Sequence, residues 1–234
     1  MSKVTHILFD FFGTLVEYSD SWTEQGYQRS HEVLLSNGAD IDYQVFLDRW
    51  SDVFREFESR SERNHDEYSM NEVVAAFLSE VLGSTAASDL VHVFRDIYLQ
   101  EWNQGVRYID GVAPLLNQLA NRYTLVLVTN THSAELVRAH VREMQVEDCF
   151  SAIVTSVEHG KRKPCASIFR CALNATGSQS ETAVYVGDSF AADYVGAKAV
   201  GMRCLLIDPD ARQDVPAEDR ISHVLDLRHA LEAG

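Results

Sequence analysis

Residues 4–16 of the chain read VTHILFDFFGTLV, and this stretch decides the fold. An apolar segment ends abruptly at one carboxylate, Asp10, and a Gly13-Thr14 pair follows it. A short apolar run that is closed by a turn signal is typical of a buried strand. In an open α/β sheet, ligands bind at the carboxyl ends of the strands. The pattern therefore predicts a strand over residues 4–10 that presents Asp10 at a ligand-binding edge of a sheet.

The second half of the chain contains more strands of this kind and alternates them with helices. Strands are predicted over residues 124–128, 152–154, 183–186 and 202–207, and helices over 112–121, 133–145, 166–175, 190–200 and 226–232. Strands that alternate with helices of about ten residues indicate βαβ units and a parallel sheet. We therefore expect residues 1–16 and 107–234 to form an α/β domain, a doubly wound parallel-sheet core of the Rossmann-like type.

Residues 17–106 have a different character, with no convincing strand and few glycines. Helices are predicted over residues 21–36, 43–62, 70–82 and 86–102. Phe46, Trp50, Val53 and Phe57 recur at steps of three and four, which is typical of a helix with one buried face. The segment has 18 acidic and 6 basic side chains, so it carries −12 of the formal charge of −15. We expect an inserted, all-helical and strongly acidic cap domain.

Composition and charge exclude several classes of partner. A net charge of −15 argues against binding to nucleic acid or to an anionic membrane, because both require a basic face. The four cysteines show no C-x-x-C spacing, and no apolar run approaches the about 18 residues of a membrane span. We expect a reduced, cytoplasmic protein that acts on a small molecule; the sequence does not indicate its oligomeric state.

Polar side chains follow several of the predicted strands directly. Asp10, Thr129-Asn130 and Asp188 each come after an apolar strand, and Lys163 lies in a loop predicted over residues 158–164. The carboxyl ends of parallel strands meet at one edge of a sheet. We therefore expect these polar groups, which are far apart in the sequence, to point into one crevice.

These motifs resemble those of the haloacid dehalogenase-like (HAD) hydrolase superfamily. In that family a strand ends in D-x-D-G-T, a Ser or Thr follows a second strand, a Lys often precedes Pro, and G-D-x-x-x-x-D follows a further strand. Here the corresponding stretches are DFFGT at 10–14, Thr129-Asn130, Lys163-Pro164 and GDSFAAD at 187–193. The resemblance covers residues 1–16 and 107–232, and residues 17–106 match the family's helical cap in position, length and helicity.

The resemblance implies a role for each matching residue. Asp10 is the expected covalent nucleophile, because an aspartyl intermediate divides one hard displacement into two easier steps. Lys163 is expected to stabilise the charge of the nucleophile and of the transferring group. Thr129 is expected to hydrogen-bond a phosphoryl oxygen. The expected substrate contacts are Gly13, Thr14 and Asn130, with a bond to the neighbouring loop as an alternative for Asn130.

Mg²⁺ is the cofactor that the resemblance implies. This ion prefers octahedral oxygen ligands and keeps several waters, so it takes few protein ligands. Asp10, Asp188 and the backbone carbonyl of Phe12 are the expected ligands. Asp193 is expected to contribute either through water or as a charge at a helix N-terminus.

Phe12 departs from the family's phosphatase pattern. Phosphatases of the family carry a second aspartate at this position, which protonates the leaving alcohol, and general acid catalysis is typically worth about 10²–10⁴-fold. Efficient hydrolysis of simple alkyl phosphates is therefore doubtful. Either an acid comes from the cap, where the candidates are His31, His65, Tyr27 and Tyr68, or the leaving group needs none, as in an acyl or aryl phosphate.

Two other functions follow from the same departure. Haloacid dehalogenases of the family carry an aromatic residue at the position of Phe12, but displacement of a halide needs no metal, so the retained Asp188 favours phosphate. A metal- and phosphate-binding regulatory protein is the third hypothesis, against which the intact Asp10, Lys163 and Asp188 argue. The favoured hypothesis is a Mg²⁺-dependent phosphoryl-transfer hydrolase that acts on a small phosphorylated metabolite with weakened general-acid catalysis.

Overall fold

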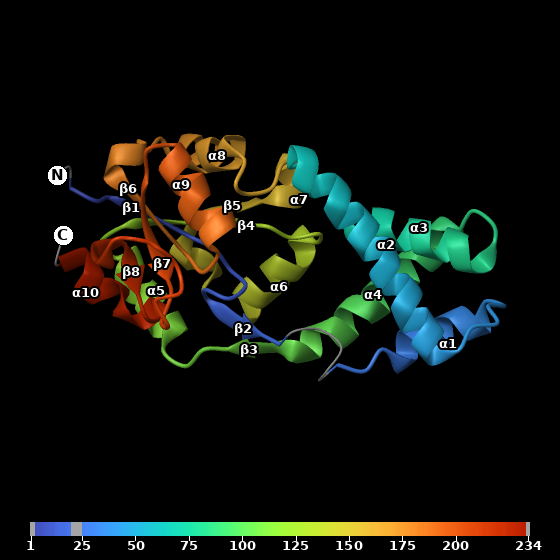
Figure 1. Cartoon of the computed structure of the whole chain (residues 1–234). Helices are drawn as coiled ribbons and strands as arrows, with labels where there is room; N and C mark the ends of the chain where they lie inside the picture. The colour runs from blue at the N-terminus through green and yellow to red at the C-terminus, as the bar shows by residue number, and fades with distance from the viewer. Residues whose placement is uncertain (1–2, 20–24, 233–234) are drawn as a thin grey trace. The chain divides into compact units, whose positions relative to one another are not determined.

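The computed structural model describes residues 3–19 and 25–232, and the chain divides into two compact units (Figure 1). The core unit comprises Met1–Glu17 and Arg107–Gly234, and the helical unit comprises Tyr18–Val106. The second segment of the core unit therefore begins after an insertion in the chain. Each unit has its own buried core, as the next paragraphs describe.

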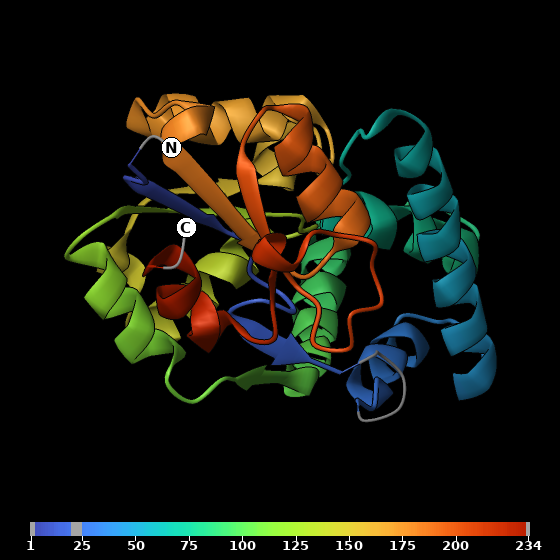
Figure 2. The ribbon, with the colours of Figure 1, turned by 60° about the vertical axis from the view of Figure 1, so that its left-hand side comes forward.

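A six-stranded parallel sheet forms the centre of the core unit (Figure 2). Its order is β5-β4-β1-β6-β7-β8, where the strands are β1 (His6–Phe9), β4 (Thr124–Thr129), β5 (Phe150–Thr155), β6 (Ala183–Gly187), β7 (Arg203–Ile207) and β8 (Arg220–Ile221). β1 lies between β4 and β6, with Leu8 opposite both Val126 and Tyr185. Parallel strands are covered on both faces, which is why they appear in the sequence as nearly continuous apolar runs.

Helices cover both faces of this sheet, so the predicted doubly wound α/β core is confirmed (Figure 1). One face carries α8 (Ala166–Thr176) and α9 (Val195–Ala199), and the other carries α5 (Val112–Ala120), α6 (Ala134–Glu143) and α10 (Leu227–Glu232). Under α8, the rings of Phe169 and Tyr185 meet with centroids 5.2 Å apart, and both side chains are fully buried.

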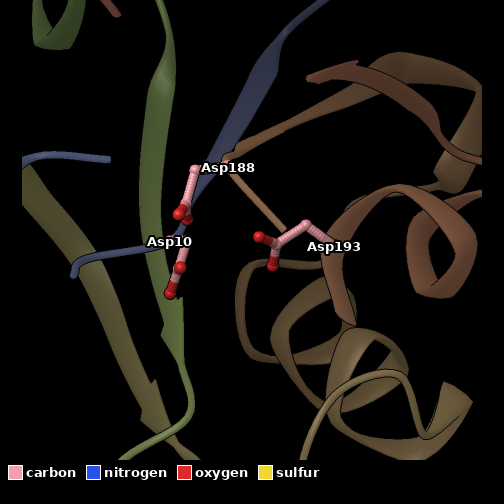
Figure 3. A group of neighbouring side chains, drawn as sticks. All are labelled: Asp10, Asp188 and Asp193. Atoms are coloured by element: carbon pink, nitrogen blue, oxygen red, sulfur yellow. The ribbon is translucent and has the colours of Figure 1, made fainter. Parts of the chain in front are cut away.

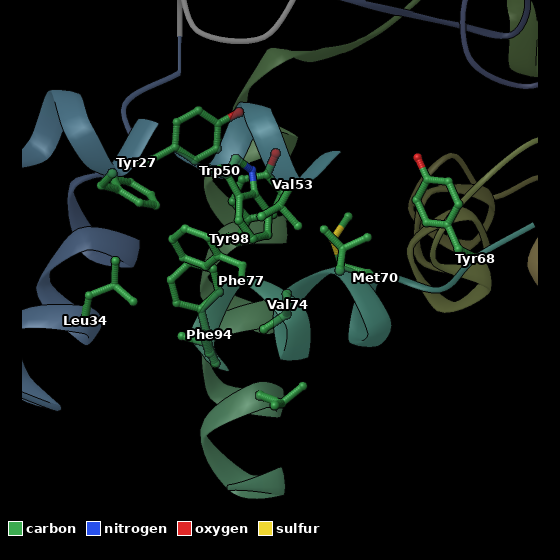
Figure 4. Packing of buried hydrophobic residues seen from close by; sticks show 14 residues of the cluster. Tyr27, Leu34, Trp50, Val53, Tyr68, Met70, Val74, Phe77, Phe94 and Tyr98 are labelled. Carbon is green, nitrogen blue, oxygen red and sulfur yellow. The ribbon is translucent and has the colours of Figure 1, made fainter. Parts of the chain in front are cut away.

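The helical unit consists of α1 (Gln28–Ser36), α2 (Tyr43–Asn64), α3 (Met70–Leu82) and α4 (Ser88–Trp102). Trp50 lies at the centre of its aromatic core, with its ring 4.9 Å from that of Phe77 and 4.5 Å from that of Tyr98 (Figure 4). The predicted apolar face of α2 is the one that is buried. α3 begins with a capping box, in which Ser69 and Glu72 satisfy each other's backbone N–H groups.

The structure differs from the sequence prediction mainly in short elements. Two strands that were not predicted, β2 (Val16–Tyr18) and β3 (Val106–Tyr108), pair where the chain passes between the units. A one-turn helix, α7 (Ser156–His159), extends into the predicted loop, and β8 was also missed. All of these elements are too short to show a period of two or of 3.6 residues.

Two predicted helices have different limits from those expected. The helix predicted over 21–36 begins at Gln28, and residues 20–24 lie outside the described residues. The helix predicted over 190–200 is a π-helical turn, Phe190–Tyr194, followed by α9. Here the Ser189 hydroxyl accepts the backbone N–H of Ala192 and so caps the segment.

The structure also bears on cysteine chemistry and on membranes. Cys149, Cys165, Cys171 and Cys204 are all free thiols. Within residues 3–19 and 25–232, no helix has the length and apolar content that crossing a membrane requires.

Candidate active site

Asp10 lies directly after β1, at the carboxyl edge of the sheet. Its backbone N–H donates to the carbonyl of Val186 at 2.9 Å, which fixes the residue beside β6. Thr129 ends β4 and Asp188 follows β6, so the order β4-β1-β6 brings all three residues to one edge. The strand order therefore places together polar groups that are far apart in the sequence.

Three carboxylates gather at this edge. Asp10, Asp188 and Asp193 each offer an oxygen atom within 4.8 Å of the others (Figure 3). Asp10 and Asp193 are buried, whereas Asp188 is exposed on one side. Partial withdrawal of its carboxylate from water, and then the charges of Asp10 and Asp193, raise the pKa of Asp188 to about 7. Burial likewise raises the pKa of Asp193, against the attraction of Lys163.

Lys163 supplies the cation that lies among these carboxylates. Its Nζ is 2.8 Å from Oδ1 of Asp10 and 2.6 Å from Oδ1 of Asp193, and its side chain is 2% exposed. Burial acts to lower the pKa of Lys163, but the charges of Asp10 and Asp193 raise it overall. One ammonium faces three carboxylates, so the site has an excess of negative charge.

Asp193 is held by protein donors on both of its oxygens. Oδ1 accepts from Lys163, and Oδ2 accepts the backbone N–H of Ser189 at 2.9 Å. Gly187 makes this approach possible, because a Cβ on it would lie 2.4 Å from Cγ of Asp193. Asp193 therefore has the second of its two expected roles, an acceptor at the N-terminus of the π-helical turn, and its contact with a metal through water stays a prediction.

Gly13 and Thr14 contact Asp188. Gly13 has a φ of +82°, and a Cβ on it would lie 2.3 Å from Oδ2 of Asp188. The Thr14 hydroxyl donates to Oδ1 of Asp188 at 3.4 Å. These residues were predicted as substrate contacts; in the structure they determine how closely the turn after β1 approaches Asp188.

Phe12 packs against aromatic rings. Its ring meets that of Phe11 at 5.0 Å and that of His140 at 6.2 Å, both edge to face. His140 is buried, its Nδ1 lies 2.9 Å from the hydroxyl of Tyr108, and burial lowers its pKa. The position that holds the leaving-group acid in phosphatases of the family thus carries an apolar ring. Metal ligation by the Phe12 carbonyl stays a prediction.

Asn130 binds the backbone of Lys163. Its Nδ2 donates to the Lys163 carbonyl at 3.1 Å, and its Oδ1 accepts the Lys163 N–H at 2.8 Å. Of the two roles expected for Asn130, a substrate contact and a bond to the neighbouring loop, the structure has the second. Thr129 is almost fully buried, and its hydroxyl donates to the carbonyl of Asn130 at 3.4 Å.

Tyr185, which was not predicted from the sequence, also belongs to the site. The Tyr185 hydroxyl accepts from Lys163 Nζ at 2.9 Å and donates to the carbonyl of Val128 at 2.8 Å. The one available signal was a tyrosine in the middle of an otherwise apolar strand, since a buried Tyr hydroxyl usually requires a partner.

The acid candidates in the helical unit have local roles there. Tyr27 is fully buried, and Nε2 of His31 lies 2.7 Å from the carbonyl of Ile41. The Tyr68 hydroxyl donates to Glu58 at 2.7 Å, and His65 ends α2 in the left-handed region with a φ of +59°. His31 and Tyr68 thus have hydrogen-bond partners in their own unit, and an acid from the cap stays a prediction.

Comparisons with known proteins agree with the motifs. The sequence model of the haloacid dehalogenase-like hydrolase family matches residues 7–207. The ribulose-1,5-bisphosphate 5-phosphatase of Halopiger xanaduensis is 24% identical, over 97% of this chain and 95% of its own. The glyceraldehyde 3-phosphate phosphatase of Pyrococcus abyssi is 24% identical, over 84% of this chain and 78% of its own. A 2-haloacid dehalogenase structure from Pseudomonas syringae has the same fold, with a TM-score of 0.74 and 21% identity. The match covers 98% of this chain and 99% of the dehalogenase chain.

Proposed function

This chain belongs to the haloacid dehalogenase-like hydrolase family, and from that premise we propose that it hydrolyses a small phosphorylated metabolite through a covalent intermediate on Asp10. The observation that carries the proposal is the buried contact between Asp10 and Lys163 beside Asp188 and Asp193. Two similar proteins are named as phosphatases of sugar phosphates, which supports phosphate rather than halide as the chemistry.

Asp10 is the proposed nucleophile. The Lys163 ammonium, 2.8 Å away, places a positive charge beside the Asp10 carboxylate and holds Oδ1 in a fixed direction. In the first step the carboxylate attacks phosphorus, the bond from phosphorus to the leaving oxygen breaks, and the leaving group takes a proton from solvent. In the second step water attacks the aspartyl phosphate, which releases inorganic phosphate and restores Asp10.

The residues at the site fit Mg²⁺. Three carboxylates lie together and Lys163 pairs with two of them, so negative charge is in excess; withdrawal from water, and then the charges of Asp10 and Asp193, raise the pKa of Asp188 to about 7. Asp10 and Asp188 would hold the ion, with the Phe12 carbonyl as a backbone ligand and Asp193 adding charge through water. When bound, the ion would neutralise charge on the phosphoryl oxygens.

Phe12 determines which leaving groups we expect. Its ring has no proton to give and packs against Phe11 and His140. The leaving group of an acyl or aryl phosphate is a carboxylate or a phenolate, a weak base that needs no acid, whereas that of an alkyl phosphate is a strongly basic alkoxide. We therefore expect acyl and aryl phosphates to be turned over faster than alkyl phosphates, although the named relatives act on sugar phosphates.

Carbon–halogen hydrolysis is the second candidate, and the aromatic Phe12 is the observation that favours it. A panel of p-nitrophenyl phosphate, acetyl phosphate, glyceraldehyde 3-phosphate and 2-chloropropionate, each with Mg²⁺ or with EDTA, separates the candidates. The proposal expects phosphate release that needs Mg²⁺ and that Asp10→Asn abolishes. Metal-independent release of chloride would overturn it in favour of the dehalogenase. Inactivity on an extended panel would favour the regulatory hypothesis.

A further inference from the structure

The Lys163 ammonium has three hydrogens and three oxygen partners. Two partners are carboxylates, Asp10 at 2.8 Å and Asp193 at 2.6 Å. The third is the Tyr185 hydroxyl at 2.9 Å, and Nζ also lies 5.4 Å from the centre of the Tyr185 ring. Since each hydrogen has an acceptor, the direction of the ammonium depends on Tyr185 as well as on the two carboxylates.

The direction of the Tyr185 hydroxyl is itself determined by its neighbours. An ammonium can only donate, so the Tyr185 oxygen accepts from Lys163 and its hydrogen must go elsewhere. The carbonyl of Val128, at 2.8 Å, receives it. The Tyr185 ring is fully buried and packs against Phe169 at 5.2 Å, so the whole side chain is held at both ends.

Tyr185 thereby connects three parts of the sheet edge. It lies on β6, binds the side chain of a loop residue, and binds the carbonyl that precedes Thr129 at the end of β4. These strands flank β1, which ends at Asp10. A displacement of the Tyr185 hydroxyl would therefore affect the contact between Lys163 and Asp10.

We propose that Tyr185 is a positioning residue of the active site, which holds the Lys163 ammonium toward Asp10 and joins it to the end of β4. The part that concerns catalysis rests on the proposed phosphatase function. The part that concerns the position of Lys163 does not, and it can be measured without substrate.

The test compares Tyr185→Phe with the matched control Tyr194→Phe. Tyr194 also has a lysine over its ring, Lys198 at 5.3 Å, and its hydroxyl donates to Asp219 at 2.8 Å. Both variants remove one hydroxyl and keep the ring. The chain has only 4 lysines, so the Nζ signals of a ¹⁵N-labelled protein can be assigned, with Lys163→Met identifying that of Lys163.

We expect the Nζ hydrogens of Lys163 to exchange slowly in the wild type. In Tyr185→Phe their exchange should accelerate by about tenfold or more, because one hydrogen bond to a charged group is lost. Tyr194→Phe should leave Lys163 unchanged. With p-nitrophenyl phosphate, Tyr185→Phe should lower kcat by about tenfold and change KM by less than about twofold.

Unchanged exchange at Lys163 in Tyr185→Phe would overturn the proposal, and so would faster exchange with an unchanged kcat. If Tyr185→Phe fails to fold, a measurement on the wild-type protein alone tests the proposal. A nuclear Overhauser effect between the Lys163 Nζ hydrogens and the Tyr185 ring hydrogens supports the proposal, and its absence overturns it. If the wild type hydrolyses no phosphate, the proposed function fails while the exchange result still decides the position of Lys163.

Discussion

Nζ of Lys163 lies 2.6 Å from Oδ1 of Asp193, and the two side chains are 2% and 0% exposed. An ion pair removed so completely from water is costly to break, because the remaining partner stays buried without compensation. The same ammonium also reaches Asp10. Lys163 therefore contributes both to stability and to the position of the proposed nucleophile.

Lys163→Met tests the first contribution. We expect the free energy of unfolding at pH 8 in EDTA to fall by about 3–5 kcal/mol, because the buried carboxylates of Asp10 and Asp193 then lack their positive partner. Urea unfolding measures it. Lys198→Met is the control: Lys198 pairs with Asp219 at 2.7 Å, but its side chain is 41% exposed, so its loss should cost about 1 kcal/mol or less. Equal losses in the two variants would contradict the stabilising role of Lys163.

The charged residues of the site could be predicted from the sequence, and so could a bond from Asn130 to the neighbouring loop, but the bond between Lys163 and Tyr185 could not. Asp10 and Asp188 each follow a strand whose apolar pattern is strong, and Lys163 is followed by Pro164, so motif and periodicity indicate all three. Asn130 and Tyr185 reach Lys163 because β4 and β6 both flank β1. Strand order is a property of the folded sheet, and no local pattern in a single sequence encodes it.

The parallel sheet and the apolar face of α2 were predictable for a related reason. Each depends on a periodicity repeated over several residues, such as the run from Thr124 to Val128. β2 and β3 have three residues each and pair only with each other, so their existence depends on a contact between distant segments. Such short strands can be recognised only once the folded structure is known.

The raised pKa of Asp188, about 7, predicts that protons and Mg²⁺ compete for this carboxylate. Between its usual pKa of about 4 and about 7, the folded metal-free protein holds a proton that the unfolded chain releases. This group's contribution to stability therefore falls as pH rises through that window. We expect added Mg²⁺ to raise the Tm more at pH 8 than at pH 5.5, and the apparent Kd for Mg²⁺ to rise toward tenfold per pH unit below about 7.

Calorimetric titration and thermal unfolding, each at several pH values, measure this competition. Asp188→Asn is the control, because it removes the titrating carboxylate and should abolish the difference between the two pH values. A Mg²⁺ effect on Tm that is equal at pH 5.5 and pH 8 in the wild type would show that Asp188 is not the group that binds the ion.

Gly13→Ala separates a backbone effect from a steric effect. Gly13 has a φ of +82°, and an added Cβ would lie 2.3 Å from Oδ2 of Asp188. Gly201 has a φ of +76°, and an added Cβ on it would meet nothing within 4 Å. Both alanine variants should lose about 1–2 kcal/mol of stability from the left-handed backbone. Only Gly13→Ala should also weaken Mg²⁺ binding, since Asp188 must move; equal Mg²⁺ affinities in the two variants would contradict this.

Phe12→Asp tests whether the missing acid limits the reaction. A carboxylic acid at this position could protonate an alkoxide leaving group, so kcat for an alkyl phosphate should rise, by at most about 10²–10⁴-fold. Acetyl phosphate releases acetate, which leaves without a proton, so kcat for this substrate should change little. Phe12→Asn is the matched control, because it has the same size as the aspartate and also removes the ring contacts with Phe11 and His140, but it carries no acid.

Steady-state rates of the wild type and both variants, with both substrates at pH 5.5–7.5, show whether a gain in kcat comes from the new acid or from the loss of the ring. A gain that Phe12→Asn shares would come from the lost ring, and the absence of any gain would mean that the acid comes from another residue or that alkyl phosphates are not substrates.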